Sequence, residues 1–273
     1  MSSTPIEPET PADTANPQNL ERFGATLGSL MQELDWALLG RAYCWEDGDD
    51  FFGDEDQGQL LDASLAIATD LGASLGRLAR ASTRSLYVGV GLAELAPMAL
   101  ESIVLGREVV ACSLDGEEVR ELGRARRAVV AKVDGDLGPG PSLPAIEPAE
   151  LGSSQTGGRY SHLWFVSVIS DPEAFPALHD SLYDRVPGAG DHASPFATGK
   201  GNLKQDRAQA EALVSLAVQG LEAPGLLTTT DEELPFFRDA LAARGLALVA
   251  PEHARLSPIV GDPLRHCHVE VAQ

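Results

Sequence analysis

Ser85-Leu-Tyr-Val-Gly-Val-Gly-Leu-Ala-Glu-Leu-Ala-Pro-Met-Ala-Leu-Glu101 passes from a strand pattern through a glycine turn into a helix pattern. The apolar residues from Leu86 to Val90 are typical of a buried parallel strand, and Gly89 and Gly91 permit close approaches that a side chain would block. Such a turn leaves backbone N–H groups pointing at the sheet edge, where cofactors commonly bind. The alternative is an ordinary tight connection between a strand and a helix, because a short Gly-x-Gly pattern is weak alone.

The composition favours a globular protein with a full hydrophobic core. The chain has 273 residues, 44% of them hydrophobic, which suits one large α/β domain with additions or two small domains. Its 41 acidic and 20 basic residues give a net charge of −21. Since this charge repels phosphate backbones and anionic lipids, we expect neither nucleic acid nor a membrane surface as a partner.

Cysteine usage and the absence of a targeting pattern indicate a cytoplasmic protein. Cys44, Cys112 and Cys267 are widely separated and form no C-x-x-C pair, which disfavours a disulfide framework and a thiolate zinc site. No apolar run approaches the ~18 residues of a membrane span. The first residues also lack a basic region followed by an apolar one, so we expect no secretory signal.

The first 56 residues divide into a tail, a helix and an acid-rich loop. Residues 1–18 are rich in Pro, Ser, Thr and acids, which predicts a disordered tail. Apolar residues at helical spacing from Asn19 to about Ala42 predict an amphipathic helix. Residues 45–56 hold seven acids and three aromatics. This segment is either a solvated loop or a lid whose carboxylates favour a cationic substrate.

The rest of the chain alternates between helix and strand patterns. Apolar periodicity and glycine, proline and capping residues predict helices over residues 57–80, 92–105, 115–123, 203–221 and 231–244. Short apolar runs predict further strands over residues 108–114, 128–133, 162–169, 225–230, 246–250 and 266–271. Such alternation indicates an α/β fold with a largely parallel sheet.

Three segments resemble the class I S-adenosylmethionine-dependent methyltransferases over about Gln57 to Gln273. Val88-Gly-Val-Gly-Leu-Ala-Glu-Leu95 is similar to the first motif of that family, Val109 to Val119 to the second, and Val133-Asp-Gly-Asp136 to the third. The resemblance implies a Rossmann-like, doubly wound, seven-stranded sheet that is mostly parallel and has a C-terminal antiparallel strand. Residues 19–56 then form the N-terminal helix and acidic loop, outside a methyltransferase-like domain of residues 57–273.

The resemblance also implies S-adenosyl-L-methionine as the cofactor and a set of contacts to it. These residues are Gly89, Gly91, Ala93, Ser113, Asp115 and Asp136. Two positions depart from the family pattern: Tyr87 stands where the first motif has an acid, and Ser113 stands where the second has the acid that binds the ribose. Asp115 is either a substitute for that acid or the cap of the following helix.

The implied activity is methyl transfer to a small molecule or to a peptide or protein, with a cationic acceptor favoured by the acidic loop. Asp171, after the fourth strand, and His192, in a long loop, are candidates for a general base, and Asp171 is alternatively a helix cap. The competing hypothesis is a methyltransferase-like scaffold without catalysis, whose N-terminal helices bind a second copy of the chain or another protein.

Two other classes of site fit less well. A dinucleotide-binding G-x-G-x-x-G turn would need a third glycine where Glu94 stands. His266 and His268 would lie on one face of a strand and Cys267 on the other, which disfavours a metal site.

Overall fold

The computed structural model describes residues 16–43, 53–78, 83–149, 151–153, 156–183, 200–259 and 261–272. Residues 1–15 of the predicted tail, most of the acid-rich segment and the candidate base His192 lie outside these ranges.

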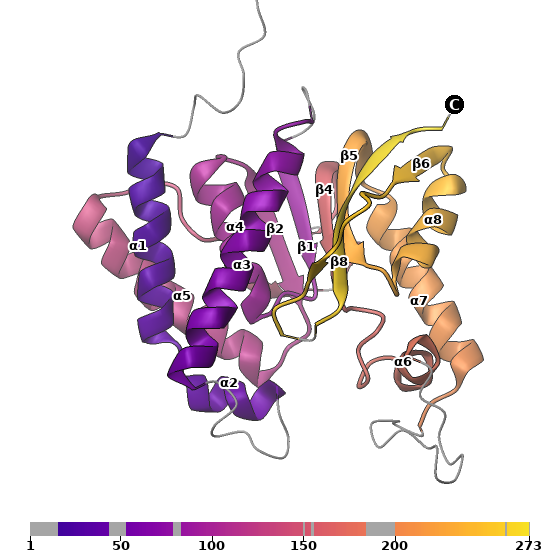
Figure 1. Cartoon of the computed structure of the whole chain (residues 1–273), viewed down its shortest axis with the longest axis horizontal. Coiled ribbons are helices and arrows are strands. Elements are labelled where there is room, and N and C mark those ends of the chain that lie inside the picture. The colour runs from indigo at the N-terminus through magenta and orange to yellow at the C-terminus, as the bar shows by residue number, and fades with distance from the viewer. Residues whose placement is uncertain are drawn as a thin grey trace, which may run out of the picture.

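The core of the protein is one sheet in the order β3-β2-β1-β4-β5-β8-β6, with β7 paired to β8 (Figure 1). Neighbouring strands from β3 to β5 are parallel, and β8 runs antiparallel to β5, β6 and β7. This confirms the mostly parallel, doubly wound sheet of the methyltransferase type, with β7 as an addition of two residues. The strands are β1 (Arg84–Val88), β2 (Glu108–Ser113), β3 (Ile146–Pro148), β4 (Tyr160–Phe165), β5 (Leu221–Thr230), β6 (Leu246–Val249), β7 (Arg255–Leu256) and β8 (Pro263–Val271).

Helices cover both faces of the sheet (Figure 1). Successive side chains of a strand point to opposite faces, so each buried strand contributes apolar residues to both faces. Tyr87 of β1 joins the core under the first five helices, whereas Leu86 and Val88 join the core under the last three. The first set is α1 (Pro17–Glu33), α2 (Trp36–Tyr43), α3 (Asp54–Leu75), α4 (Leu95–Ala99) and α5 (Glu117–Leu137), with a 3₁₀ turn η2 (Leu92–Glu94) and a π-helical turn η3 (Leu100–Val104) beside α4. The second set is α6 (Pro176–Leu182), α7 (Leu203–Val218) and α8 (Leu234–Ala242).

The N-terminal region forms two helices where the sequence pattern predicted one. Asn16 caps α1 by accepting the Gln18 N–H, so the helix begins inside the predicted tail. The chain leaves the helical conformation at Leu34, and the Asp35 carboxylate then accepts the Leu38 N–H at the start of α2. Helix α1 packs its apolar side against α5, α4 and η3, so much of the apolar surface of α1 is buried within this chain.

The largest error in the sequence prediction concerns α5. This helix continues to Leu137, so the strand predicted over residues 128–133 and the helix end at Gly123 are wrong. Leu122, Ala125 and Val129 are completely buried at helical spacing, and packing against α1 and the sheet therefore outweighs the local strand pattern. The third strand is instead β3, within the segment predicted as a loop.

The second half of the chain follows the prediction more closely. Strand β4 lies between β1 and β5 with all six residues buried, which confirms its central position. Strand β5 and helix α7 overlap the predicted segments, although β5 begins at Leu221, within the predicted helix, and α7 ends at Val218. Asp231 does not cap α8, because its carboxylate pairs with Arg265 and Glu233 is the residue before the helix.

Candidate functional site

The turns after β1 and β4 meet at the carboxyl edge of the sheet. Gly89 has a φ of +71°, and a Cβ built on it would lie 2.7 Å from Cγ2 of Val168. Both the backbone conformation and the close approach therefore require glycine here. The sequence prediction of a glycine turn at this edge is confirmed.

The N–H groups of this turn are already bonded within the chain. The Gly91 N–H donates to Oε2 of Glu94 at 2.9 Å, and the Leu92 N–H donates to Oε1 of Glu118 at 3.0 Å. The Leu92 nitrogen also lies 3.2 Å from Oη of Tyr43, whose hydroxyl donates to Glu118. A Cβ on Gly91 would lie 2.7 Å from the Tyr43 Oη and 2.8 Å from the Glu118 Oε1. In this arrangement the space over Gly91 is filled by the chain's own side chains.

Both carboxyl groups at the turn lie in a poorly solvated environment. Burial raises the pKa of Glu94 to about 7, although the N–H of Gly91 favours the ionised form. Burial likewise raises the pKa of Glu118 to about 7 against the opposing effect of the Leu92 N–H. Each group therefore changes charge near neutral pH.

The other predicted cofactor contacts are only partly brought together. Ala93 is buried in η2 beside the turn, and Ser113 ends β2 at the same sheet edge. Asp115 forms a two-pronged ion pair with Arg120, at 3.0 and 2.9 Å, and Gly116 rather than Asp115 is the cap of α5.

Asp136 lies apart from these residues. It stands in the last turn of α5, a helix of 21 residues that begins at the carboxyl edge. A helix of that length extends roughly 30 Å, which places Asp136 at the opposite edge of the sheet. Its prediction as an adenine contact rested on a strand that the structure does not contain.

A second polar group gathers where β4 ends. Ser167 adopts a φ of +56°, which is uncommon for a residue with a side chain, and its Oγ lies 3.3 Å from Oδ2 of Asp262. The Tyr183 hydroxyl donates to the same oxygen at 2.6 Å. Burial, followed by the hydrogen bond to Asp262, raises the pKa of Tyr183. These three residues come from different segments and form a hydroxyl–carboxylate cluster.

Glu233 holds the backbone of this turn in place. Its Oε1 accepts the N–H groups of Val168 at 2.7 Å and Ile169 at 2.9 Å, while Oε2 accepts the Thr229 hydroxyl at 3.0 Å. Burial raises the pKa of Glu233 to about 7. The predicted base Asp171 also supports local structure, because its Oδ1 accepts the N–H groups of Glu173 and Ala174.

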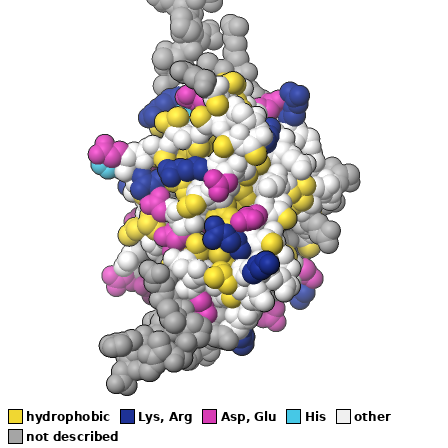
Figure 2. Space-filling model, turned by 90° about the vertical axis from the view of Figure 1, so that its right-hand side faces the viewer, with side chains coloured by type: hydrophobic (Ala, Val, Ile, Leu, Met, Phe, Trp, Pro, Cys, Tyr) yellow, Lys and Arg dark blue, Asp and Glu magenta, His cyan; other side chains and the backbone are white. Residues whose placement is uncertain are grey.

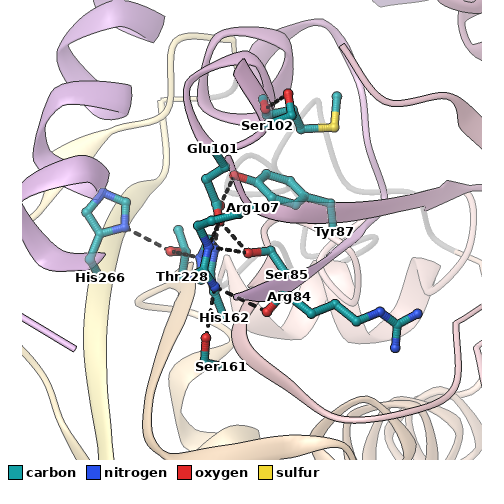
Figure 3. Close-up of polar contacts among 11 residues, drawn as sticks. Arg84, Ser85, Tyr87, Glu101, Ser102, Arg107, Ser161, His162, Thr228 and His266 are labelled. Carbon is teal, nitrogen blue, oxygen red and sulfur yellow. Dashed lines mark hydrogen bonds and ion pairs between the residues drawn. The ribbon is translucent and has the colours of Figure 1, made fainter. Parts of the chain in front are cut away.

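A buried ion cluster, which the sequence did not reveal, lies between η3 and one face of the sheet and is centred on Glu101 of η3 (Figure 3). The Glu101 carboxylate accepts the Tyr87 hydroxyl at 2.6 Å, bonds Nδ1 of His162 at 2.6 Å and pairs with Nε of Arg107 at 2.7 Å. It also accepts the Ser85 hydroxyl. Burial alone would raise the pKa of Glu101, but His162 and Arg107 outweigh it and lower the value to about 2.

The cluster continues across the sheet from His162. Its Nε2 lies 2.9 Å from Oγ1 of Thr228, which lies 2.8 Å from Nδ1 of His266 (Figure 3). Cys267 packs in the core on the other face, as the alternation of a strand requires. The described residues contain no group of three or more metal-ligating side chains.

Tyr87 belongs to this buried cluster. Its ring stacks on Trp164 at a centroid distance of 5.2 Å, and burial followed by the charge of Glu101 raises its pKa well above the ordinary value. The residue that replaces the family's first acid is thus directed into the core, under α3 and α4, and away from the carboxyl edge.

Comparisons with known proteins give similarities of fold only. No protein-family model matches the sequence, and no curated protein is similar to it. Similar solved structures include the O-methyltransferase from Bacillus cereus in complex with SAH, at 9% identity over 95% of this chain and 94% of that chain, with a TM-score of 0.36. Cofactor-bound Rv0187 from MTB has 11% identity over 98% and 100%, with a TM-score of 0.36. Precorrin-6y C5,15-methyltransferase from Geobacter metallireducens has 10% identity over 72% and 84%, also at 0.36. These similarities are too weak to add to what the strand order shows.

Two further findings bear on partners. None of the helices in the described ranges is long and apolar enough to cross a membrane. Figure 2 shows the face beside β6 and α8, where basic and acidic side chains are interspersed among apolar ones.

Proposed function

We propose that the protein is an S-adenosylmethionine-dependent methyltransferase that acts on a small molecule or on a peptide or protein. The observation that carries this proposal is the position of Gly89. Strand β1 is followed by β2 on one side, while β4 lies on its other side, so the order of strands reverses between β1 and β4. Ligands of open α/β sheets bind outside the carboxyl ends of the strands at such a reversal. The Gly89 turn packs on Val168 at this position.

The chain offers groups for both halves of such a site. The cofactor would supply a methyl group on a sulfonium. The glycine turn would provide backbone close to it, and Ser113 at the end of β2 would face the ribose. The Ser167–Tyr183–Asp262 cluster would orient the acceptor and take up its proton. The net charge of −21 favours a cationic acceptor, and a second copy of the chain or another protein remains a proposed partner of the N-terminal helices.

A catalytically inactive binding or scaffold protein is the second candidate. It is supported by the filled space over Gly91, where Tyr43 and Glu118 stand. The replacement of both family acids, by Tyr87 and Ser113, also supports it.

Calorimetric titration with S-adenosylmethionine and S-adenosylhomocysteine separates the two candidates. We expect the wild-type chain to bind, and Ser113→Asp to bind more tightly because the new carboxylate can accept a ribose hydroxyl. A hydrogen bond to a charged group contributes about 1.5 to 3 kcal/mol, which is roughly tenfold or more in affinity. Asp136→Asn, at the opposite sheet edge, is the matched control and should bind like the wild type. Absence of binding by all three folded proteins would favour the scaffold.

A further inference from the structure

Two segments far apart in the sequence converge on Gly91, beside Glu94 of the adjoining turn η2. Tyr43 comes from the last turn of α2, Glu118 from the first turn of α5 and Glu94 from η2. The Tyr43 hydroxyl donates to the Glu118 carboxylate, and the Leu92 N–H is shared between these two side chains. The contact therefore ties the N-terminal helices directly to the glycine turn.

The contact occupies both the N–H donor and the space that a ligand would use at this turn. The Leu92 N–H is the first of the helical segment after the glycine turn, where unpaired donors usually face a bound group. Here the Glu118 carboxylate accepts it at 3.0 Å, as a carboxylate of a ligand would. The space is closed as well, since even one carbon atom on Gly91 would lie 2.7 Å from Tyr43 Oη.

Separation of the two side chains would restore the donor and the space without disturbing the sheet. Glu118 is partly exposed and Tyr43 is half-buried, whereas the neighbouring Leu39, which anchors α2 to the core, is completely buried. The contact therefore joins two partly exposed side chains, Tyr43 on α2 and Glu118 on α5, and α2 is held to the core by Leu39 rather than by Tyr43.

We propose that Tyr43 and Glu118 form an autoinhibitory contact that competes with the ligand for the glycine turn. This inference rests on the proposed function, because the ligand it excludes is the S-adenosyl compound. Opening requires the Tyr43 hydroxyl to leave Glu118 and the carboxylate to leave the Leu92 N–H. A change that weakens the contact therefore tightens ligand binding.

The test uses S-adenosylhomocysteine and the full chain, with Tyr43→Phe and Glu118→Ala as variants. Each removes one side of the contact, and coupling of this kind is typically worth fivefold or more in affinity. We expect both variants to bind at least roughly fivefold more tightly than the wild type. Glu117→Ala, one residue away on α5 and exposed, removes the same charge without touching the turn and should leave affinity unchanged. Weaker binding by Glu118→Ala, or unchanged binding by both variants, would overturn the proposal.

Amide hydrogen exchange at Leu92 gives a readout that needs no ligand. In the wild type this N–H should be protected, and in Glu118→Ala it should exchange at least roughly tenfold faster because the closer of its two acceptors is gone and only the Tyr43 hydroxyl, at 3.2 Å, is left. An unprotected Leu92 N–H in the wild type would show that the contact does not form, and this result would not depend on the identity of the ligand. Faster exchange in the variant, combined with no binding of either S-adenosyl compound by any of the proteins, would refute the proposed function and with it the autoinhibition.

Discussion

Replacement of Glu101 by Gln tests whether the buried ion cluster depends on the charge of the Glu101 carboxylate. The substitution keeps the shape of the side chain and removes its charge. Glu101 has 0% of its side chain exposed and is paired with Arg107, which is only 10% exposed. Glu101→Gln therefore leaves a guanidinium buried without its counterion, beside His162.

The magnitude follows from the cost of breaking a buried ion pair and agrees with the pKa of Glu101. Removing one partner of a buried ion pair costs about 3 to 5 kcal/mol. The pKa of Glu101 falls from 4.5 to about 2 in the folded state. At about 1.4 kcal/mol per pH unit, this shift corresponds to about 3 kcal/mol. We therefore expect Glu101→Gln to lower the free energy of unfolding by about 3 kcal/mol and Tm by roughly 6 to 12 °C.

The assay is urea denaturation at pH 7, with Glu108→Gln as the matched control. Glu108 also pairs with an arginine, Arg84, but its side chain is 67% exposed, so its loss should cost less than about 1 kcal/mol. The pH dependence has a definite sign. Because the folded pKa of Glu101 is depressed, its contribution is present above about pH 4.5 and is lost as the pH falls towards 2. The stabilities of the wild type and Glu101→Gln should therefore converge as the pH falls from 4.5 to about 2. A difference between Glu101→Gln and Glu108→Gln of less than about 1 kcal/mol at pH 7 would refute the reasoning.

The raised pKa of Glu233 means that the folded state binds more protons between about pH 4.5 and 7, so stability should fall as the pH rises through this interval. Glu233→Gln should reduce this fall in stability, which is measured by urea denaturation of both proteins at pH 5 and pH 8. An equal fall in the wild type and the variant would contradict the burial of Glu233. Because Ser167 has a left-handed conformation, Ser167→Val should unfold about 2 kcal/mol more easily than Ser167→Gly in urea, and equal stabilities would contradict the backbone geometry. Burial raises the pKa of Cys112 to about 11 and of Cys267 to about 12. In Cys44→Ser protein at pH 8, a thiol reagent should therefore label neither cysteine before unfolding and both after it; rapid labelling of the native protein would show that they are exposed.

The sequence by itself determined the strands that are buried on both faces and the turn that joins the first of them to a helix. Strands β1 and β4 are short, largely apolar runs, and that pattern reflects local burial. The glycine turn was also predictable, since only glycine adopts the φ of Gly89 without strain while admitting the neighbouring turn.

Helix α5 shows where local pattern was insufficient. Residues 128–133 are rich in Val and Ala, which suits either a strand or a buried helix. The choice was made by the surfaces of α1 and the sheet, which accept a stripe of residues at helical spacing. Those surfaces come from distant parts of the chain, so the local sequence of residues 128–133 gives no information about them.

The polar sites depended entirely on the tertiary structure. His162 meets Glu101 across 61 positions of the chain, and Glu118 meets Leu92 across 26. Such pairs form only when strand register and helix packing bring the segments together, and a serine, histidine or glutamate has no apolar periodicity to reveal its partner in advance. Chain order and apolar pattern therefore determined the sheet, whereas the packing of α2 and α5 onto it decided that Tyr43 and Glu118 lie over the glycine turn.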